Sequence, residues 1–208
     1  MISHFNNKTL NNNQIINNLT IDPQTNLVIE AKYIASPNYD LRPNDTEIDL
    51  LVIHGISLPP GEFTNQSAQY IMDLFTNNLD PRVHPYFKEI YQLKLSCHCF
   101  IKRDGQLIQY VPFNYRAWHA GQSYFNGREN CNDFSIGIEL EGTDNIPYTE
   151  QQYQKLIALI KVIMKSYPKI TPNNIVGHCH IAPNRKTDPG DSFDWELIAE
   201  NFKAMNFE

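Results

Sequence analysis

A short, almost wholly apolar run, Ile48–His54 (IDLLVIH), limits the folds that the chain can adopt. Its length and branched side chains are typical of a buried strand. The run ends at Gly55, and the SLPPGEF that follows soon after contains prolines and a glycine that force a loop. A second run, Phe134–Leu140 (FSIGIEL), predicts another buried strand. His54 therefore ends a strand, where its side chain can point into a crevice at the edge of the sheet.

Helices and a hairpin are expected around these strands. Leu95–Val111 contains two apolar runs on either side of an Arg-Asp-Gly turn, which makes part of the sheet antiparallel. Thr149 opens the clearest helix, which Pro168 stops. Weaker helical patterns cover residues 66–75 and 195–204. With 208 residues, 41% of them hydrophobic, we expect an α+β fold, a single domain with a mixed β-sheet flanked by α-helices.

The start of the chain differs in composition. Seven of the thirteen residues between Asn6 and Asn18 are asparagine, so this segment can bury little apolar surface. We expect residues 1–24 to form a flexible Asn-rich extension and residues 25–208 to form the functional domain. The first twenty residues lack the apolar stretch of a signal peptide, and no run in the chain approaches the roughly 20 apolar residues that span a bilayer. The sequence predicts a cytoplasmic protein that does not act at a membrane.

The net charge and the cysteines limit the classes of molecule that the chain is expected to bind. The formal net charge of -6 argues against non-specific attraction to nucleic acid or anionic lipid, which requires a basic face. The four cysteines are expected to be reduced in the cytoplasm. They include no C-x-x-C pair, which disfavours a structural zinc site built from them.

Two of the seven histidines have positions that suit metal binding. His54 ends a strand, and His178 begins the polar stretch HCHIAPNRKTDPG, ten residues before Asp188. Imidazole and carboxylate are zinc ligands, and three protein ligands with one open position are typical of a catalytic site. The spacing alone is a weak signal, because many chains contain three such residues by chance.

Six ordered blocks strengthen this interpretation: LVIHGISLPPGEF, HPYF, SCHCFIKRDGQLIQYVPF, RAWHAG, CNDFSIGIELEGTD and GHCHIAPNRKTDPG. They closely resemble the zinc amidases of muropeptide recycling, within a wider amidase family that shares its fold with peptidoglycan recognition proteins. The resemblance covers about residues 27–196. It implies a zinc-dependent N-acetylmuramoyl-L-alanine amidase that cleaves the amide bond between (1,6-anhydro)N-acetylmuramic acid and L-Ala in small, cytoplasmic muropeptides. The oligomeric state stays open, with a monomer favoured.

The resemblance implies that Zn²⁺ is bound by His54, His178 and Asp188, and that Glu139 and Lys186 serve catalysis. Partial burial on an apolar strand could raise the pKa of Glu139 enough for it to accept and return a proton. Glu141, on the same strand face, is its rival. Lys186 and Asp188 are two residues apart, so an extended backbone would aim both side chains toward the metal and the oxyanion beside it.

Substrate binding is assigned to Trp118, His119 and Lys94. Trp118 could stack on a sugar ring, although a core tryptophan is the alternative. His119 could line the substrate groove, or it could be a structural loop histidine.

Three positions depart from the family pattern. Gly55 and His180 stand where asparagine is expected, and Asn130 stands where arginine is expected. The changes at Gly55 and Asn130 could each remove a contact to the stem peptide. His180 places a spare imidazole close to the metal ligands in the sequence.

Two other functions remain open. A lytic amidase would attack intact cell wall, but the sequence shows neither an export signal nor a wall-binding module. A non-catalytic recognition module would share the fold, but that branch typically loses the metal ligands that this chain retains.

Overall fold

The computed structural model describes residues 18–203. The strands are β1 (Lys32–Tyr33), β2 (Tyr39–Asp40), β3 (Leu50–Ile56), β4 (Cys99–Ile101), β5 (Leu107–Gln109), β6 (Arg116–Ala117), β7 (Tyr124–Phe125), β8 (Arg128–Glu129), β9 (Ser135–Glu141) and β10 (Ile175–Gly177). The helices are α1 (Asn65–Phe75), α2 (Phe87–Ile90), α3 (Glu150–Ser166), α4 (His178–Ile181) and α5 (Trp195–Phe202), with 3₁₀ turns η1 (Cys131–Asp133) and η2 (Pro172–Asn174). None of the helices between residues 18 and 203 has the length and hydropathy that crossing a bilayer requires.

A six-stranded mixed sheet forms the centre of the fold, in the order β1-β5-β4-β9-β3-β10. β4, β9, β3 and β10 run parallel, and β5 pairs with β4 in the antiparallel direction. This arrangement confirms the α+β class and the predicted hairpin. The predicted buried strands correspond to β3 and β9, but β3 continues to Ile56. His54 therefore lies within the strand rather than at its end.

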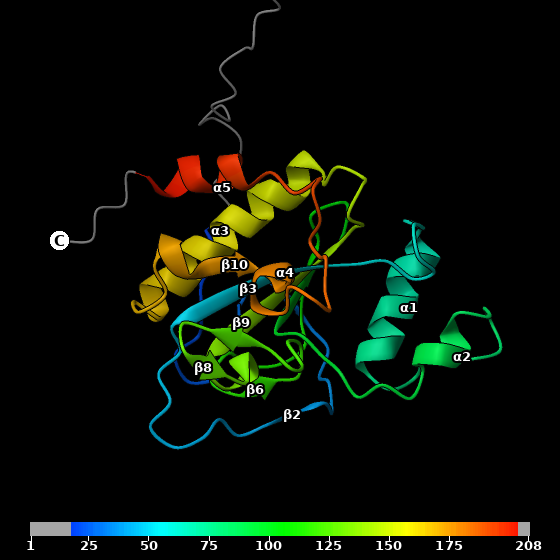
Figure 1. The fold of residues 1–208 in the computed structure, drawn as a ribbon, viewed down its shortest axis with the longest axis horizontal. Helices are drawn as coiled ribbons and strands as arrows, with labels where there is room; N and C mark the ends of the chain where they lie inside the picture. The colour runs from blue at the N-terminus through cyan, green and yellow to red at the C-terminus, as the bar shows by residue number, and fades with distance from the viewer. Residues whose placement is uncertain (1–17, 204–208) are drawn as a thin grey trace, which may run out of the picture.

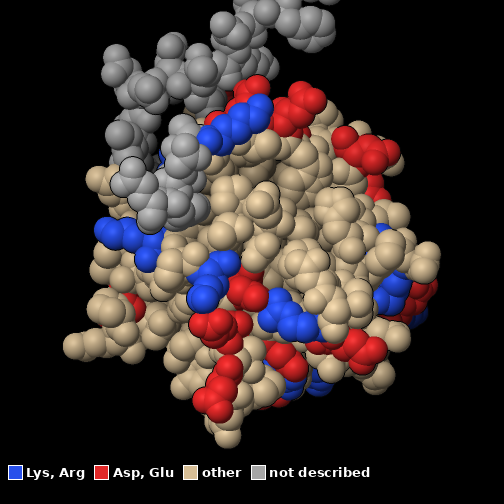
Figure 2. Space-filling model, turned by 60° about the vertical axis from the view of Figure 1, so that its left-hand side comes forward, with Lys and Arg blue, Asp and Glu red and all other residues tan. Residues whose placement is uncertain are grey.

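The two faces of the sheet carry different layers. Leu51 and Ile53 of β3 and Ile136 and Ile138 of β9 belong to the core cluster that includes the apolar stripe of α3. Thr149, predicted to open this helix, caps α3 through a capping box with Gln152. Figure 1 shows α3 and α5 on one side of the sheet and β6 and β8 on the other. Among the described side chains on the face drawn in Figure 2, acidic and basic groups are interspersed.

The opposite face of β3 and β9 belongs to the site. Leu50 and Val52 of β3 pack there against Ala120, which follows β6, and against Ile181, which ends α4. Because side chains alternate along a strand, His54 continues the row of Leu50 and Val52 on this face. The same alternation places Glu139 on this face too, because its neighbour Ile138 points toward α3.

Ordered packing begins before the expected boundary at residue 25. Leu19 is buried in the α3-side core, and Ile21 forms a β-bridge with Val28. Residues 18–24, expected in the flexible extension, therefore belong to the domain, because the Asn-rich composition stops at Asn18 and apolar side chains follow. The remainder of that predicted extension, residues 1–17, lies outside the described residues.

Leu19→Ala is expected to lower the free energy of unfolding by about 2 kcal/mol, because it removes buried apolar atoms and leaves a cavity at the edge of the core. Urea unfolding measures the change. Thr20→Ala is the matched control, since Thr20 is exposed and uses its backbone N–H, not its side chain, to bind Glu30. Equal stability of the two variants would show that this segment does not support the fold.

Candidate metal centre and active site

Three neighbouring parallel strands, β9, β3 and β10, place the predicted catalytic and metal-binding residues near their carboxyl ends. His54 of β3 and Glu139 of β9 are register partners, so their side chains lie side by side on the same face. β10 pairs with β3 through Gly177 and Ile53, and His178 follows Gly177 directly. His178 is therefore level with His54. The carboxyl edge of parallel strands is the usual place for a site in such sheets.

His54, His178 and Asp188 meet at a single point. The Nδ1 atoms of the two histidines are 3.0 Å apart, and each lies 3.2 Å from Oδ2 of Asp188. A tetrahedral ion with bonds of about 2.0 Å holds its ligands about 3.3 Å apart. The three ligand atoms therefore have the spacing that a metal ion requires.

The protonation of His178 also fits a metal ligand. Its Nε2 lies 3.0 Å from the carbonyl oxygen of Ala120, which can only accept a hydrogen bond. The neutral ring must therefore carry its proton on Nε2 and present the lone pair of Nδ1 to the cluster. Nδ1 is the atom that faces His54 and Asp188.

Electrostatics give the cluster a neutral imidazole at His54 and an anion at Asp188. Burial lowers the pKa of His54 to about 4 and keeps its ring neutral, the form that binds metals. Burial acts to raise the pKa of Asp188, but the polar contacts with His178 and His54 outweigh it and hold this pKa well below its usual range. Two imidazoles and one carboxylate leave a fourth position open on a tetrahedral ion, as in catalytic centres.

Glu139 has the properties of a proton carrier. Its side chain is buried, and its Oε2 has no hydrogen-bond partner among the described residues. Burial, and next the charge of Asp188, raise the pKa of Glu139 well above its usual range, against the opposing effect of Lys186. Such a carboxyl group beside a metal site can take up and release a proton.

The rival Glu141 is engaged elsewhere. Its Oε2 accepts a hydrogen bond of 2.9 Å from the backbone N–H of Arg103, in the turn between β4 and β5. Lys186, by contrast, lies near enough for its ammonium to influence the pKa values of both His54 and Glu139. The structure thus brings Glu139 and Lys186 to the cluster and ties Glu141 to the hairpin.

The sequence profile of the N-acetylmuramoyl-L-alanine amidase family matches residues 44–191. The chain belongs to this family. The amidase is 56% identical over 182 residues to the 1,6-anhydro-N-acetylmuramyl-L-alanine amidase AmpD of Haemophilus influenzae, covering 88% of this chain and 97% of the relative. It is accordingly a hydrolytic enzyme.

Solved structures agree with this assignment. A crystal structure of a selenomethionine derivative of AmpD superposes on the amidase with a TM-score of 0.81 at 55% identity, covering 85% of this chain and 97% of the other. The N-acetylmuramyl-L-alanine amidase AmiD of Escherichia coli, in complex with the substrate anhydro-N-acetylmuramic acid-L-Ala-D-γ-Glu-L-Lys, has a TM-score of 0.57 at 30% identity. That match covers 77% of this chain and 60% of the other.

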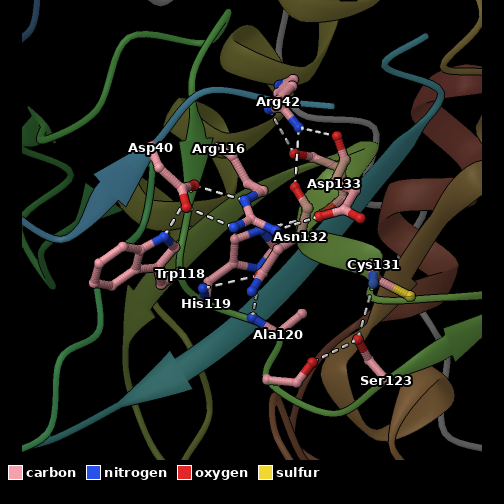
Figure 3. A network of polar contacts seen from close by, with 12 residues as sticks. Asp40, Arg42, Arg116, Trp118, His119, Ala120, Ser123, Cys131, Asn132 and Asp133 are labelled. Carbon is pink, nitrogen blue, oxygen red and sulfur yellow. Dashed lines mark hydrogen bonds and ion pairs between the residues drawn. The ribbon is translucent and has the colours of Figure 1, made fainter. Parts of the chain in front are cut away.

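The residues expected to bind substrate occupy three different settings in the amidase. Trp118 is half-buried, and its indole N–H donates to Asp40, which also pairs with Arg116 (Figure 3). His119 is buried, and its two ring nitrogens contact His54 and Ser135, which differs from the expected place in a groove. Lys94 is exposed on the loop before β4, and no contact among the described residues links it to the cluster.

Two of the three departures have a local structural reason. His180 accepts a hydrogen bond of 2.9 Å from the N–H of Gly177 through Nδ1, and its ring packs beside Trp195. The spare imidazole is therefore not part of the metal cluster. Asn130 has a φ of 57°, the left-handed conformation that asparagine adopts more readily than arginine.

The third departure, Gly55, makes room for Tyr148. A Cβ at Gly55 would lie 2.3 Å from the hydroxyl oxygen of Tyr148, which donates a hydrogen bond of 2.9 Å to the carbonyl of Pro189. Because Pro189 follows Asp188, this hydrogen bond from Tyr148 holds in place the loop that carries Asp188. No sequence pattern pointed to Tyr148.

Gly55→Ala is expected to cost about 1–3 kcal/mol of stability through overpacking and to weaken metal binding by displacing Tyr148. Thermal unfolding and metal titration measure the two effects. In a Tyr148→Phe background the nearest remaining atoms stand 3.5 and 3.6 Å from the added Cβ, so the same substitution should cost much less. Equal costs in both backgrounds would refute the contact as the cause.

Proposed function

We propose that this amidase is a Zn²⁺ enzyme that hydrolyses the amide bond between 1,6-anhydro-N-acetylmuramic acid and L-Ala in free, cytoplasmic muropeptides. The observation that carries the proposal is the group His54, His178 and Asp188, with mutual contacts of 3.0–3.2 Å beside buried Glu139. The named activity of the Haemophilus influenzae relative and the anhydro substrate in the AmiD complex support the choice of substrate.

The proposed roles follow from the position of each group. A Zn²⁺ ion bound by the three ligands would polarise the scissile carbonyl and acidify water at the open position. Glu139 takes the proton that the attacking water loses as its oxygen bonds to the carbonyl carbon. Glu139 then delivers this proton to the amine nitrogen of L-Ala as the C–N bond breaks, and the sugar acid and the free peptide leave. The ammonium of Lys186 stabilises the negative charge on the carbonyl oxygen.

A comparison of substrates tests the proposal. Purified protein is incubated with an anhydro-muropeptide, the corresponding muropeptide with a reducing sugar end, and intact sacculi, and the released peptide is quantified by mass spectrometry. We expect kcat/KM to be far higher for the anhydro-muropeptide, because discrimination is a difference in transition-state binding. The Glu139→Gln variant, prepared in the same way, controls for contaminating amidases.

Two outcomes would overturn the proposal in different directions. Comparable efficiency on sacculi and on the anhydro-muropeptide would identify a lytic amidase. Binding of both substrates without release of peptide would identify a recognition module of the same fold.

A further inference from the structure

The ring of His54 has a second nitrogen that points away from the metal cluster. Its Nε2 lies 2.9 Å from Nδ1 of His119, and the two rings meet edge to face with centroids 5.0 Å apart. The other nitrogen of His119, Nε2, lies 3.1 Å from the hydroxyl oxygen of Ser135 on β9. A chain of three polar groups thus leads from the cluster into the sheet.

When a metal is bound, the hydrogen bonds from His54 to His119 and from His119 to Ser135 can be donated in only one direction. If Nδ1 of His54 gives its lone pair to the ion, the neutral ring carries its proton on Nε2 and donates it to His119. His119 then accepts at Nδ1, carries its own proton on Nε2 and donates to Ser135. All three side chains are buried, so each of these groups depends on the next for its hydrogen bond.

His119 is held in place from two sides. The backbone N–H groups of His119 and Ala120 both donate to Oδ1 of Asn132, at 3.1 and 2.8 Å (Figure 3). The ring lies against Gly137 of β9, where an added Cβ would stand 2.4 Å from Cγ of His119. The absence of a side chain at Gly137 is therefore what lets an imidazole fit between this strand and His54.

We propose that His119 is a positioning residue of the metal centre, which accepts the Nε2–H of His54 and so aims the Nδ1 lone pair of that ligand at the ion. This inference rests on the metal centre of the proposed function. Groups that orient metal-binding histidines are commonly carboxylates or carbonyls. A neutral imidazole in this place fixes the tautomer of His54 without adding negative charge near the metal.

Zinc affinity of two His119 variants tests the proposal. His119→Leu removes the acceptor, and His119→Asn keeps an oxygen close to the position of Nδ1. Competition with a chelator at equilibrium should show about a 10- to 100-fold weaker affinity for His119→Leu, the usual effect of losing such a partner. His119→Asn should stay within a few-fold of the unmodified protein. Thermal unfolding of the metal-free proteins controls for folding.

Nitrogen NMR of the zinc-loaded protein shows which ring nitrogen of His54 carries the proton. This proton position would not change if His119 served only to fill space. The His54 ring should carry its proton on Nε2, in a hydrogen bond that His119→Asn preserves and His119→Leu loses. Ser135→Ala, which keeps both imidazoles, covers the case in which His119→Leu does not fold. It should weaken zinc binding in the same direction by a smaller factor, because the buried Nε2–H of His119 then lacks its acceptor.

Unchanged zinc affinity in His119→Leu, or in Ser135→Ala where His119→Leu is unfolded, would overturn the proposal. Equal losses in folded Leu and Asn variants would also overturn it, because shape rather than hydrogen-bond acceptance would then matter. Failure of the proposed function is a separate result: the unmodified protein would then bind no zinc or cleave no muropeptide.

Discussion

Glutamine at position 139 is expected to leave the metal bound and to lower kcat about a hundred- to ten-thousand-fold, the usual contribution of a general acid–base group. The amide has the shape of the carboxyl group but cannot carry the proton from water to the leaving amine. Elemental analysis gives the metal content, and turnover of an anhydro-muropeptide at saturating concentration gives kcat.

Glu141→Gln is the matched control, because Glu141 shares the strand and the face of Glu139. Its carboxylate binds the N–H of Arg103, so its loss should affect stability more than turnover. Near-normal kcat in Glu139→Gln, together with a large loss in folded Glu141→Gln, would transfer the catalytic role to Glu141.

Asp188→Ala is expected to weaken metal binding by at least about a hundred-fold, beyond the effect of losing an outer partner, and to reduce activity to background. Asp188 is the one anion in the cluster, with contacts of 3.2 Å to both imidazoles. Its loss removes one of the three candidate ligands and the only negative charge among them. Equilibrium titration of the stripped protein with Zn²⁺ measures the change.

Two neighbours provide controls for this prediction. Asp191→Ala removes an exposed carboxylate from the same loop and should bind zinc normally. His180→Ala should also keep its zinc, because Nδ1 of His180 binds the N–H of Gly177. Retention of zinc by Asp188→Ala with loss by His180→Ala would show that the third ligand is His180.

The elements that the sequence predicted are those with strong local signals. β3 and β9 follow from apolar runs of strand length, and α3 follows from its start signal at Thr149 and its stop at Pro168. β10 has only three residues, too few for a periodic pattern, and it forms because it pairs with β3. That pairing brings His178 level with His54, so the assembly of the cluster could not be derived from spacing.

The surroundings of the cluster were less predictable than its ligands. Resemblance to a family implies the candidate ligands, whereas the place of His119 depends on a loop that folds back onto β9. The sequence does contain a feature that could have indicated this place. Ser135 and Gly137 share the strand face of Glu139, and they offer a hydroxyl group and space for a ring. At Gly55 the sequence indicates a lost contact to the stem peptide, whereas the space that this glycine leaves for Tyr148, a residue distant in sequence, is visible only in the fold.

Zinc titration of activity shows whether the group His54, His178 and Asp188 holds a catalytic metal ion. The protein is stripped with a chelator, Zn²⁺ is added in steps, and peptide release from an anhydro-muropeptide is measured at each step. The proposed centre predicts no turnover without metal, a linear rise, and a plateau at one zinc ion per chain, with no recovery in Asp188→Ala. Full turnover by the metal-free protein would show that hydrolysis needs no metal at this cluster.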